Sequence, residues 1–222
     1  MKEVKWIHYL TVSLISFLAF MLELFSIFVL EKMIFHFDIW NYTVNQRSLH
    51  CLMTAGLWAV FIIAVLVYTQ KRYHFPIQKD NYQKILSRNW INVLICLIGC
   101  KIMTFIDWHT FKVIGEMQNK TIYQFSAQYI YYFFEVALIL MIIIYGQKAI
   151  ETYLHRESSI PFGGIILALT WGVFHFVSRG VGIEVWNGIS CMIFSILGGF
   201  IYLNLKRKYG LSYLIIAIGY LL

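Results

Sequence analysis

The sequence contains few charged residues and only two prolines. Charged residues make up 13% of its 222 residues, whereas hydrophobic residues make up 60%. A soluble chain needs about a quarter of its residues charged to cover its surface. The composition therefore excludes a soluble globular domain and a disordered scaffold, and it predicts an integral membrane protein.

Cysteines are also few, and all four lie in apolar stretches: Cys51, Cys96, Cys100 and Cys191. Disulfide frameworks do not form in such positions, so these cysteines are expected to be small buried residues and do not report the redox compartment. The net charge of +7 does not indicate a nucleic-acid partner, because basic residues in a membrane chain gather in cytoplasmic loops. We expect no nucleic-acid binding, and membrane lipids as the surroundings of the chain.

Long apolar runs are abundant. A spanning helix needs about 20 mainly apolar residues, and this pattern predicts an all-α, polytopic membrane bundle of about seven helices. The last segment is short and is compatible with a tilted or re-entrant helix as well as with a span. The predicted helices cover residues 7–30, 52–69, 90–106, 125–147, 162–183, 185–204 and 209–222.

The distribution of basic residues predicts the orientation. Seven crossings place the N-terminus and the loops at 70–89, 148–161 and 205–208 on one side of the bilayer, with twelve of the 18 Lys and Arg residues. The other side holds five, and Lys101 lies within a helix. Because basic residues favour the cytoplasmic side, we expect the N-terminus in the cytoplasm. The chain has no linker-like segment, which predicts one domain over residues 1–222, in the plasma membrane.

Four ionisable residues stand out inside the predicted helices, between the midplane and the outer half of the bilayer: Glu23, Lys101, Glu135 and His175. Each is costly in hydrocarbon and needs a partner, a wet cavity or a function. One interpretation is a structural ion pair of Lys101 with Glu135 or Glu23. The other is a functional site, because a carboxylate beside a histidine also builds proton and metal sites. Helix periodicity fixes faces and not neighbours, so both interpretations stay open.

The predicted helix at 162–183 has the most distinctive polar face. Trp171, His175 and Arg179 follow one another at helical spacing and share that face. His175 is either a hydrogen-bonded structural residue or a metal ligand, and Arg179 is expected to extend outward to the membrane surface. We include both residues in the candidate intramembrane polar cluster.

Signatures of several soluble enzyme classes are absent. The sequence contains no H-E-x-x-H, no G-x-S-x-G, no phosphate-binding glycine loop and no dinucleotide motif. These enzyme classes are therefore excluded.

The C-terminal half contains fragments of a known set of motifs. Trp171 and His175 keep an aromatic residue four positions before a histidine, and residues 195–222 contain a Gly-rich helix, a turn and a final helix. In these features residues 130–222 resemble the CAAX prenyl endopeptidase and bacteriocin-processing (CPBP, Abi) family of intramembrane metalloproteases. The resemblance implies a helical membrane fold in which glutamates and histidines hold a metal or activate water for peptide hydrolysis.

This chain departs from the family pattern at the other motif positions. Leu140 and Met141 stand where the paired glutamates belong, and Tyr145 stands at the arginine. A shifted alignment uses 151–156, which keeps one Glu and one Arg at the membrane edge. Ile218 occupies the place of the last histidine and cannot bind metal. The chain is therefore interpreted as a degenerate member, a pseudoenzyme without a confident catalytic residue.

Three functions are compatible with these residues and motifs. The first is a non-catalytic binding or regulatory protein, with a lipid, a peptide or a membrane protein as partner and with no cofactor. The second is a small transporter or substrate-capture subunit with a polar cavity near the midplane. The third is an active membrane metallo-endopeptidase, in which His175 and Glu135 would serve an unconventional zinc site.

Overall fold

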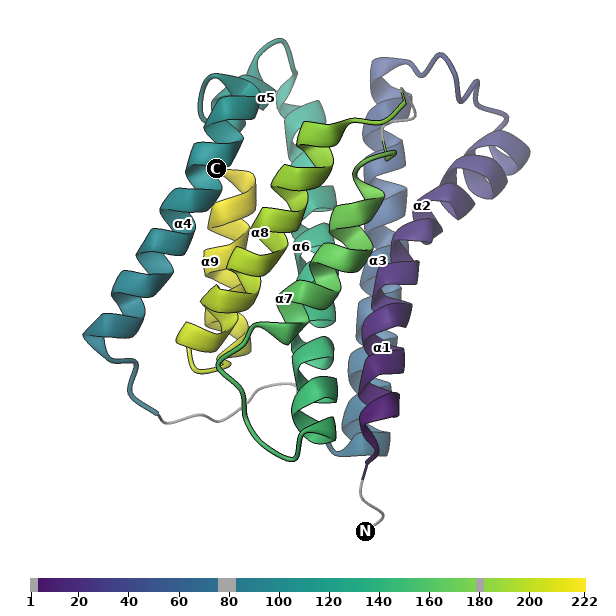
Figure 1. The fold of residues 1–222 in the computed structure, drawn as a ribbon. Coiled ribbons are helices and arrows are strands. Elements are labelled where there is room, and N and C mark those ends of the chain that lie inside the picture. Colours follow the sequence, from purple (N-terminus) through teal and green to yellow (C-terminus); the bar gives the residue numbers. More distant parts are fainter. Residues whose placement is uncertain (1–3, 76–82, 179–181) are drawn as a thin grey trace.

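The computed structural model describes residues 4–75, 83–178 and 182–222, and these residues form helices, turns and short connections without a strand. The helices run side by side in one bundle (Figure 1). This arrangement confirms the predicted all-α helical membrane bundle. The elements are α1 Trp6–Leu18, η1 Ala19–Met21, α2 Leu22–Phe25, η2 Ser26–Ile34, α3 Val44–Tyr73, α4 Ser87–Trp108, α5 Lys112–Met117, α6 Ile122–Tyr153, α7 Phe162–Leu167, η3 Ala168–Gly172, α8 Val185–Asn204 and α9 Tyr209–Leu221.

The first apolar segment is longer and less regular than the predicted helix at 7–30. It continues to Ile34, and η2 at its end is a π-helix, in which residues five apart come together. This spacing lets the Ser26 hydroxyl donate a 2.7 Å hydrogen bond to the carboxylate of Glu31. In Figure 1 the part that follows α1 leans away from the other helices. Hydropathy ended the predicted helix one residue before Glu31, which is fully buried.

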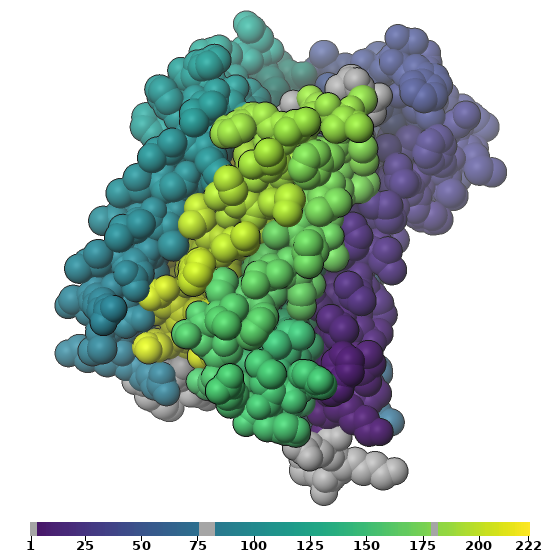
Figure 2. Space-filling model, in the orientation of Figure 1, coloured from purple at the N-terminus to yellow at the C-terminus, as the bar shows by residue number. Residues whose placement is uncertain are grey.

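Helix α6 occupies the centre of the bundle. It packs against α1, α3, α7 and α9, and from Leu138 to Gln147 every residue is buried. A helix that is apolar on all sides must be surrounded by other helices. Figure 2 shows α7 and α8 covering one face of the molecule, between α4 and α1. The interior of the bundle is therefore built around α6.

Close contacts between backbones hold α7 in place. A Cβ atom on Gly163 would lie 2.0 Å from the carbonyl oxygen of Ile143 on α6, and a Cβ on Gly164 would lie 2.6 Å from the carbonyl oxygen of Ser195 on α8. Small residues allow such approaches between membrane helices. Helix α7 is thus wedged between its two neighbours.

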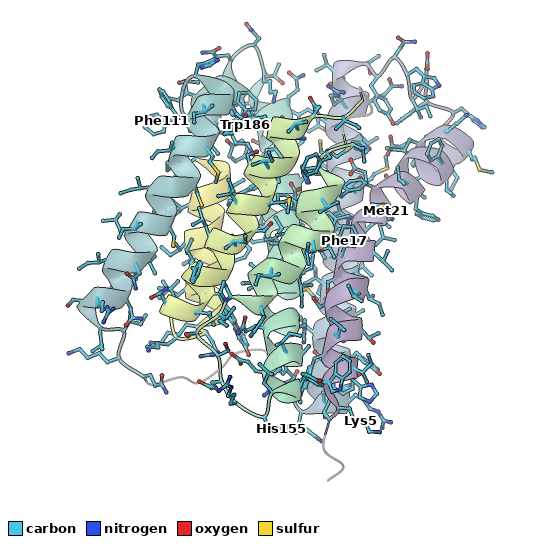
Figure 3. All side chains as sticks on the ribbon, in the orientation of Figure 1. Lys5, Phe17, Met21, Phe111, His155 and Trp186 are labelled. Atoms are coloured by element: carbon cyan, nitrogen blue, oxygen red, sulfur yellow. The ribbon has the colours of Figure 1, made fainter. Side chains whose placement is uncertain are left out.

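The helix ends divide into two groups. Lys5 and His155 mark one end, which we call the basic end, and Phe111 and Trp186 mark the opposite end, which we call the distal end (Figure 3). The basic end contains the start of α1 and the C-terminus of α3 (Figure 1). The α6–α7 and α8–α9 connections lie at the same end. This agrees with the predicted sidedness of the loops. Which end faces the cytoplasm stays a prediction from the basic residues.

In the described part of the chain, five helical segments are long and apolar enough to cross a membrane: Trp6–Ile34, Val44–Tyr73, Ser87–Met117, Ile122–Tyr153 and Val185–Asn204. Many of their large apolar side chains are exposed, such as Val60 at 70% and Ile95 at 62%, as expected of surfaces that face lipid. The chain is a multi-pass membrane protein. The Phe162–Gly172 and Tyr209–Leu221 segments are shorter and pack against the long helices.

The predicted helix at 162–183 ends earlier than its apolar sequence suggests. Backbone bonds from His175 to Gly172, Phe176 to Val173 and Val177 to Phe174 are of the tighter three-residue type, which commonly closes a helix. Gly182 then has φ +111°, a conformation that L-residues rarely adopt. Hydropathy does not distinguish an apolar turn from a helix, so the prediction overextended this element.

Two of the long helices begin with capping boxes. The hydroxyl of Thr43 accepts from the backbone N–H of Gln46, whose side chain accepts from the backbone N–H of Thr43. Thr121 and Gln124 repeat the arrangement at the start of α6. The Thr-x-x-Gln pattern is a helix-start signal, and it places both helix starts several residues before the hydropathy boundaries.

We expect Thr121→Ala to lower the free energy of unfolding by about 1 kcal/mol, because the first turn of α6 loses a partner for a free N–H group. Thermal unfolding in detergent, followed by tryptophan fluorescence, measures this loss. Thr11→Ala is the comparison, since the Thr11 hydroxyl only donates to the carbonyl within its own helix. Equal melting temperatures of the two variants would contradict the capping role.

Candidate functional site: a polar layer near the distal end

A histidine between two glutamates joins the first apolar segment to α3. His50 Nδ1 lies 2.8 Å from Glu31 Oε1, and His50 Nε2 lies 3.2 Å from Glu23 Oε1. Carboxylates only accept hydrogen bonds, so both contacts are satisfied when both ring nitrogens carry protons. Glu31 also accepts from Ser26 and from the Tyr42 hydroxyl. We call Glu23, Glu31, His50 and Tyr42 the His50 cluster.

Tyr42 is the only member of the His50 cluster outside the apolar segments. Burial raises the pKa of its hydroxyl, and the adjacent Glu31 carboxylate raises it further. Tyr42 therefore stays a neutral hydrogen-bond donor at physiological pH. Its hydroxyl fixes one oxygen of Glu31 while His50 holds the other.

A second group of charged residues lies where α5 meets α6 and α9. Lys112 is 7% exposed, and its ammonium nitrogen lies 4.4 Å from the ring centroid of Tyr132 and 4.0 Å from that of Tyr220. The Tyr132 hydroxyl donates to Glu116 at 2.7 Å, and the Tyr220 hydroxyl donates to Glu135 at 2.9 Å. Both glutamates attract the Lys112 ammonium. We call these five residues the Lys112 cluster.

Neighbouring tyrosines of α6 connect the two clusters. The Tyr131 hydroxyl donates to Glu23 at 3.1 Å, and the rings of Tyr131 and Tyr132 lie 5.8 Å apart. Charged and hydrogen-bonded side chains thus extend from η2 through α3 and α6 to α5 and α9. We call the His50 cluster, Tyr131 and the Lys112 cluster together the distal polar layer.

The structure brings some of the candidate residues from the sequence together. Glu23 belongs to the His50 cluster and Glu135 to the Lys112 cluster, and the two carboxylates are close enough to repel each other. Trp171 hydrogen bonds to Glu135 and its ring lies 4.1 Å from that of His175. Trp171 therefore separates Glu135 from His175 at the edge of the layer. Arg179 lies outside the described residues.

The expected ion pair of Lys101 is not formed. The Lys101 ammonium nitrogen is buried and has no hydrogen-bond partner among the described residues, and the ammonium of Lys112 on α5 repels it. Lys112 supplies the cation beside Glu135 instead. The sequence pattern predicts Lys112 in an outer loop, whereas the chain folds back after α4 and inserts this side chain between α6 and α9.

Eight members of the layer were not predicted from the sequence: its four tyrosines and Glu31, His50, Lys112 and Glu116. His50 fell between two predicted helices, although the Thr43 and Gln46 capping signal starts α3 early enough to include it. Glu31 lay one residue beyond a predicted helix end. No local signal marks Lys112 and Glu116, because α5 is a six-residue helix whose position depends on tertiary packing.

His50→Ala should lower the free energy of unfolding by about 1–3 kcal/mol, because it removes a donor from the fully buried Glu31. The matched comparison is a double-mutant cycle with Glu31→Gln, which removes the buried charge that His50 serves. We expect the His50→Ala loss to shrink in the Glu31→Gln background when thermal unfolding of all four proteins is compared. Strictly additive losses would mean that the two side chains do not interact.

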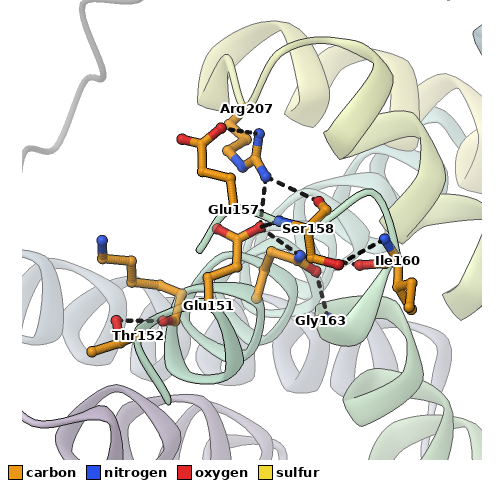
Figure 4. Close-up of polar contacts among 9 residues, drawn as sticks. Glu151, Thr152, Glu157, Ser158, Ile160, Gly163 and Arg207 are labelled. Atoms are coloured by element: carbon orange, nitrogen blue, oxygen red, sulfur yellow. Dashed lines mark hydrogen bonds and ion pairs between the residues drawn. The ribbon is translucent and has the colours of Figure 1, made fainter. Parts of the chain in front are cut away.

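A separate hydrogen-bond network closes the basic end (Figure 4). Arg207 donates to Glu151 at 2.5 Å and to the carbonyl of Ser158 at 3.1 Å, and it forms an ion pair with Glu157 at 3.2 Å. Gln147 donates to Glu151 at 2.8 Å and accepts from the backbone N–H of Gly163 at 3.0 Å. These contacts tie α6, α7 and the α8–α9 connection together, which indicates a structural role.

An apolar cavity of about 200 Å³ lies between α3, α6 and α9. Its lining includes Leu66, Phe75, Met141 and Tyr209, and no charged residue lines it. It is distinct from the distal polar layer, and its lining offers tyrosine hydroxyls but no charged group.

A metal centre is not assembled in the described part of the chain, where no group of three or more His, Cys, Asp or Glu side chains is arranged to hold an ion. The His50 nitrogens point to two different carboxylates, and Nδ1 of His175 lies 2.7 Å from the carbonyl of Trp171. Leu140, Met141 and Tyr145, at the positions of the family's first motif, are buried core residues.

Comparison of the chain with protein-family models, curated proteins and solved structures finds no match.

Proposed function

We propose that this multi-pass membrane protein is a non-catalytic binding protein of the plasma membrane, and that its ligand or partner engages the distal polar layer. The partner is a small polar molecule, a peptide or another membrane protein that reaches the layer from the distal side. The resemblance to the CPBP metalloproteases is part of this proposal, as a related fold with an altered site.

The observation that carries the proposal is the burial of charge in the layer. Glu31, Glu116, Glu135 and Lys112 are each less than 9% exposed, and apolar residues of similar volume would pack such a position at lower cost. Within the layer, Glu116 Oε2 remains without a hydrogen-bond partner among the described residues, and so does the Lys101 ammonium nitrogen outside it. Buried charges with unused bonding capacity are typical of binding sites rather than of helix packing alone.

The arrangement gives less support to an active metallo-endopeptidase. Peptide hydrolysis by a zinc enzyme needs several protein ligands that converge on the metal and a base beside the metal-bound water. His50 uses both ring nitrogens on two carboxylates, and in the described part of the chain no group of three His, Cys, Asp or Glu side chains converges on one point. The chemistry of the layer is hydrogen bonding and charge pairing, which suits recognition.

A substrate-capture or transport subunit is the second candidate, because the layer lies toward one end of the bundle. Between the layer and the basic-end network, α6 is buried by apolar neighbours from Leu138 to Ile144. A carrier would have to open this packed region, whereas a capture subunit would not. Uptake by proteoliposomes distinguishes the two.

The proposal is tested by thermal unfolding in lipid nanodiscs with a cationic probe, an anionic probe and a neutral probe: tetramethylammonium, glutamate and glycerol. We expect one charged probe to raise the melting temperature of the wild type and to have a weaker effect on Glu135→Gln and Glu116→Gln. Arg156→Ala, a change at an exposed position of the basic end, should respond like the wild type. The absence of any response to the charged probes, or the same response in all variants, would contradict the proposal.

A further inference from the structure

The Lys112 cluster has the composition of a receptor for an organic cation. The rings of Tyr132 and Tyr220 lie 5.7 Å apart at an interplanar angle of 86°, and both face the Lys112 ammonium nitrogen, at 4.4 Å and 4.0 Å. Aromatic faces at this distance attract cations through the ring quadrupole. Two walls of a cation site are therefore in place.

Carboxylates complete these walls. Each tyrosine that faces the ammonium also donates its hydroxyl to a glutamate, Tyr132 to Glu116 and Tyr220 to Glu135. These bonds orient the rings and place two negative charges near the same cation. Rings, hydroxyls and carboxylates thus form one connected cage around the Lys112 ammonium.

One carboxylate oxygen of the cage is not used by Lys112, the residue that now occupies it. Glu116 is 2% exposed, and its Oε2 has no hydrogen-bond partner among the described residues. Its other oxygen, Oε1, is held by Tyr132. A buried carboxylate oxygen without a donor is costly, and an ammonium ligand that brings its own N–H groups would satisfy it.

The present occupant belongs to a short helix whose apolar side chains are largely exposed. Lys112 is the first residue of α5, which has six residues and follows a turn in which His109 has φ +52°. Of the contacts that α5 makes with other elements, the main ones are with α4, and Phe111, Ile114 and Met117 are exposed by half or more. Segments with few buried contacts open more easily than buried helices, so the start of α5 with Lys112 is the part that an external ligand can displace, while Glu116 is held by Tyr132.

We propose that Tyr132, Tyr220, Glu116 and Glu135 form a binding site for organic ammonium groups, and that Lys112 is a tethered occupant that an external ammonium ligand replaces. This inference rests on the proposed function and names its ligand class. Binding from the distal side would withdraw the Lys112 side chain from the cage, while Glu116 on the same helix stays held by the Tyr132 hydroxyl. The ligand exchange involves no covalent step.

The test is chemical rescue of Lys112→Ala in nanodiscs. Removing the side chain leaves the two glutamates facing an empty cage, so the melting temperature should fall. Ethylammonium, which matches the end of the lysine side chain, should restore it, and sodium chloride at equal ionic strength should not. Because the wild-type lysine competes from a tethered position, we expect the apparent affinity for ethylammonium to be about tenfold or more tighter in Lys112→Ala than in the wild type.

Two controls address the cage itself. Lys112→Ala combined with Tyr220→Leu removes one aromatic wall and should abolish the rescue. Equal rescue in this double variant, or no rescue in a folded Lys112→Ala protein, would overturn the inference. If Lys112→Ala does not fold, tetramethylammonium is titrated into the wild type and Glu116→Gln, and a melting-temperature increase that is not smaller in Glu116→Gln would overturn it as well.

The outcomes separate this inference from the proposed function. Stabilisation of the wild type by glutamate that depends on Glu135 or Glu116, without rescue of Lys112→Ala by ethylammonium, would refute the ammonium cage and leave a binding protein of another ligand class. A lack of response to every charged probe would count against both.

Discussion

Gly163→Ala should destabilise the protein more than any other single methyl addition to the bundle. The added carbon would lie 2.0 Å from the carbonyl oxygen of Ile143 and within 3 Å of two further backbone atoms of that residue. A backbone group in the middle of the buried α6 cannot rotate away as a side chain can, so α7 must move as a unit. We expect the free energy of unfolding to fall by about 3 kcal/mol or more, the upper end of the usual cost of overpacking a core.

The displacement would also break a polar contact. The backbone N–H of Gly163 donates to the side chain of Gln147, which in turn holds Glu151, so the damage should spread into the basic-end network. Thermal unfolding and detergent-extracted yield measure the effect. The matched control is Gly56→Ala on α3, where a Cβ meets nothing within 4 Å and the better helix propensity of alanine adds about 0.5–1 kcal/mol. Similar melting temperatures of the two variants would show that α7 does not pack in this way.

Arg207→Ala should also lower the stability of the protein strongly. The carboxylate of Glu151 is 9% exposed and depends on Arg207 for its countercharge, and Arg207 also holds the carbonyl of Ser158. Removing one partner of a buried ion pair leaves an uncompensated charge, which costs about 3–5 kcal/mol. The melting temperature should drop sharply, and Glu151→Gln in the same chain should recover part of it, because the leftover charge is then absent.

Arg156→Ala provides the control for this change. Arg156 is an exposed cation at the same end of the bundle, so its removal alters the net charge equally and should change stability by less than about 0.5 kcal/mol. If Arg207→Ala and Arg156→Ala melt together, the network in Figure 4 does not stabilise the basic end.

Hydropathy predicted the helices well where a segment is both apolar and bounded by polar residues. The helix at 185–204 has the predicted bounds, and α9 differs from the predicted 209–222 by its last residue. At 162–183 the sequence is apolar beyond the helix, and hydrogen bonding through tighter turns ends it near Gly172. Hydrophobicity determines which residues avoid water, whereas backbone hydrogen bonds and glycine conformation determine where a helix ends.

The candidate site was predictable in part, for a similar reason. The cost of charge in hydrocarbon identified Glu23 and Glu135, and both belong to the distal polar layer. The cation beside Glu135 is Lys112 rather than Lys101, because the chain reverses after α4 and directs α5 toward the bundle. A sequence reports which residues share a helix face, but contacts between helices depend on how the connections turn.

We propose that the polar residues of this bundle recognise a ligand and do not hold a catalytic metal. Elemental mass spectrometry of the purified protein tests this proposal, in the wild type beside His175→Ala and Glu135→Ala. Because no group of three His, Cys, Asp or Glu side chains converges among the described residues, we expect far less than one zinc per chain in all three proteins. Near-stoichiometric zinc in the wild type, lost in either variant, would contradict the claim and assign the chain to the metallo-endopeptidases.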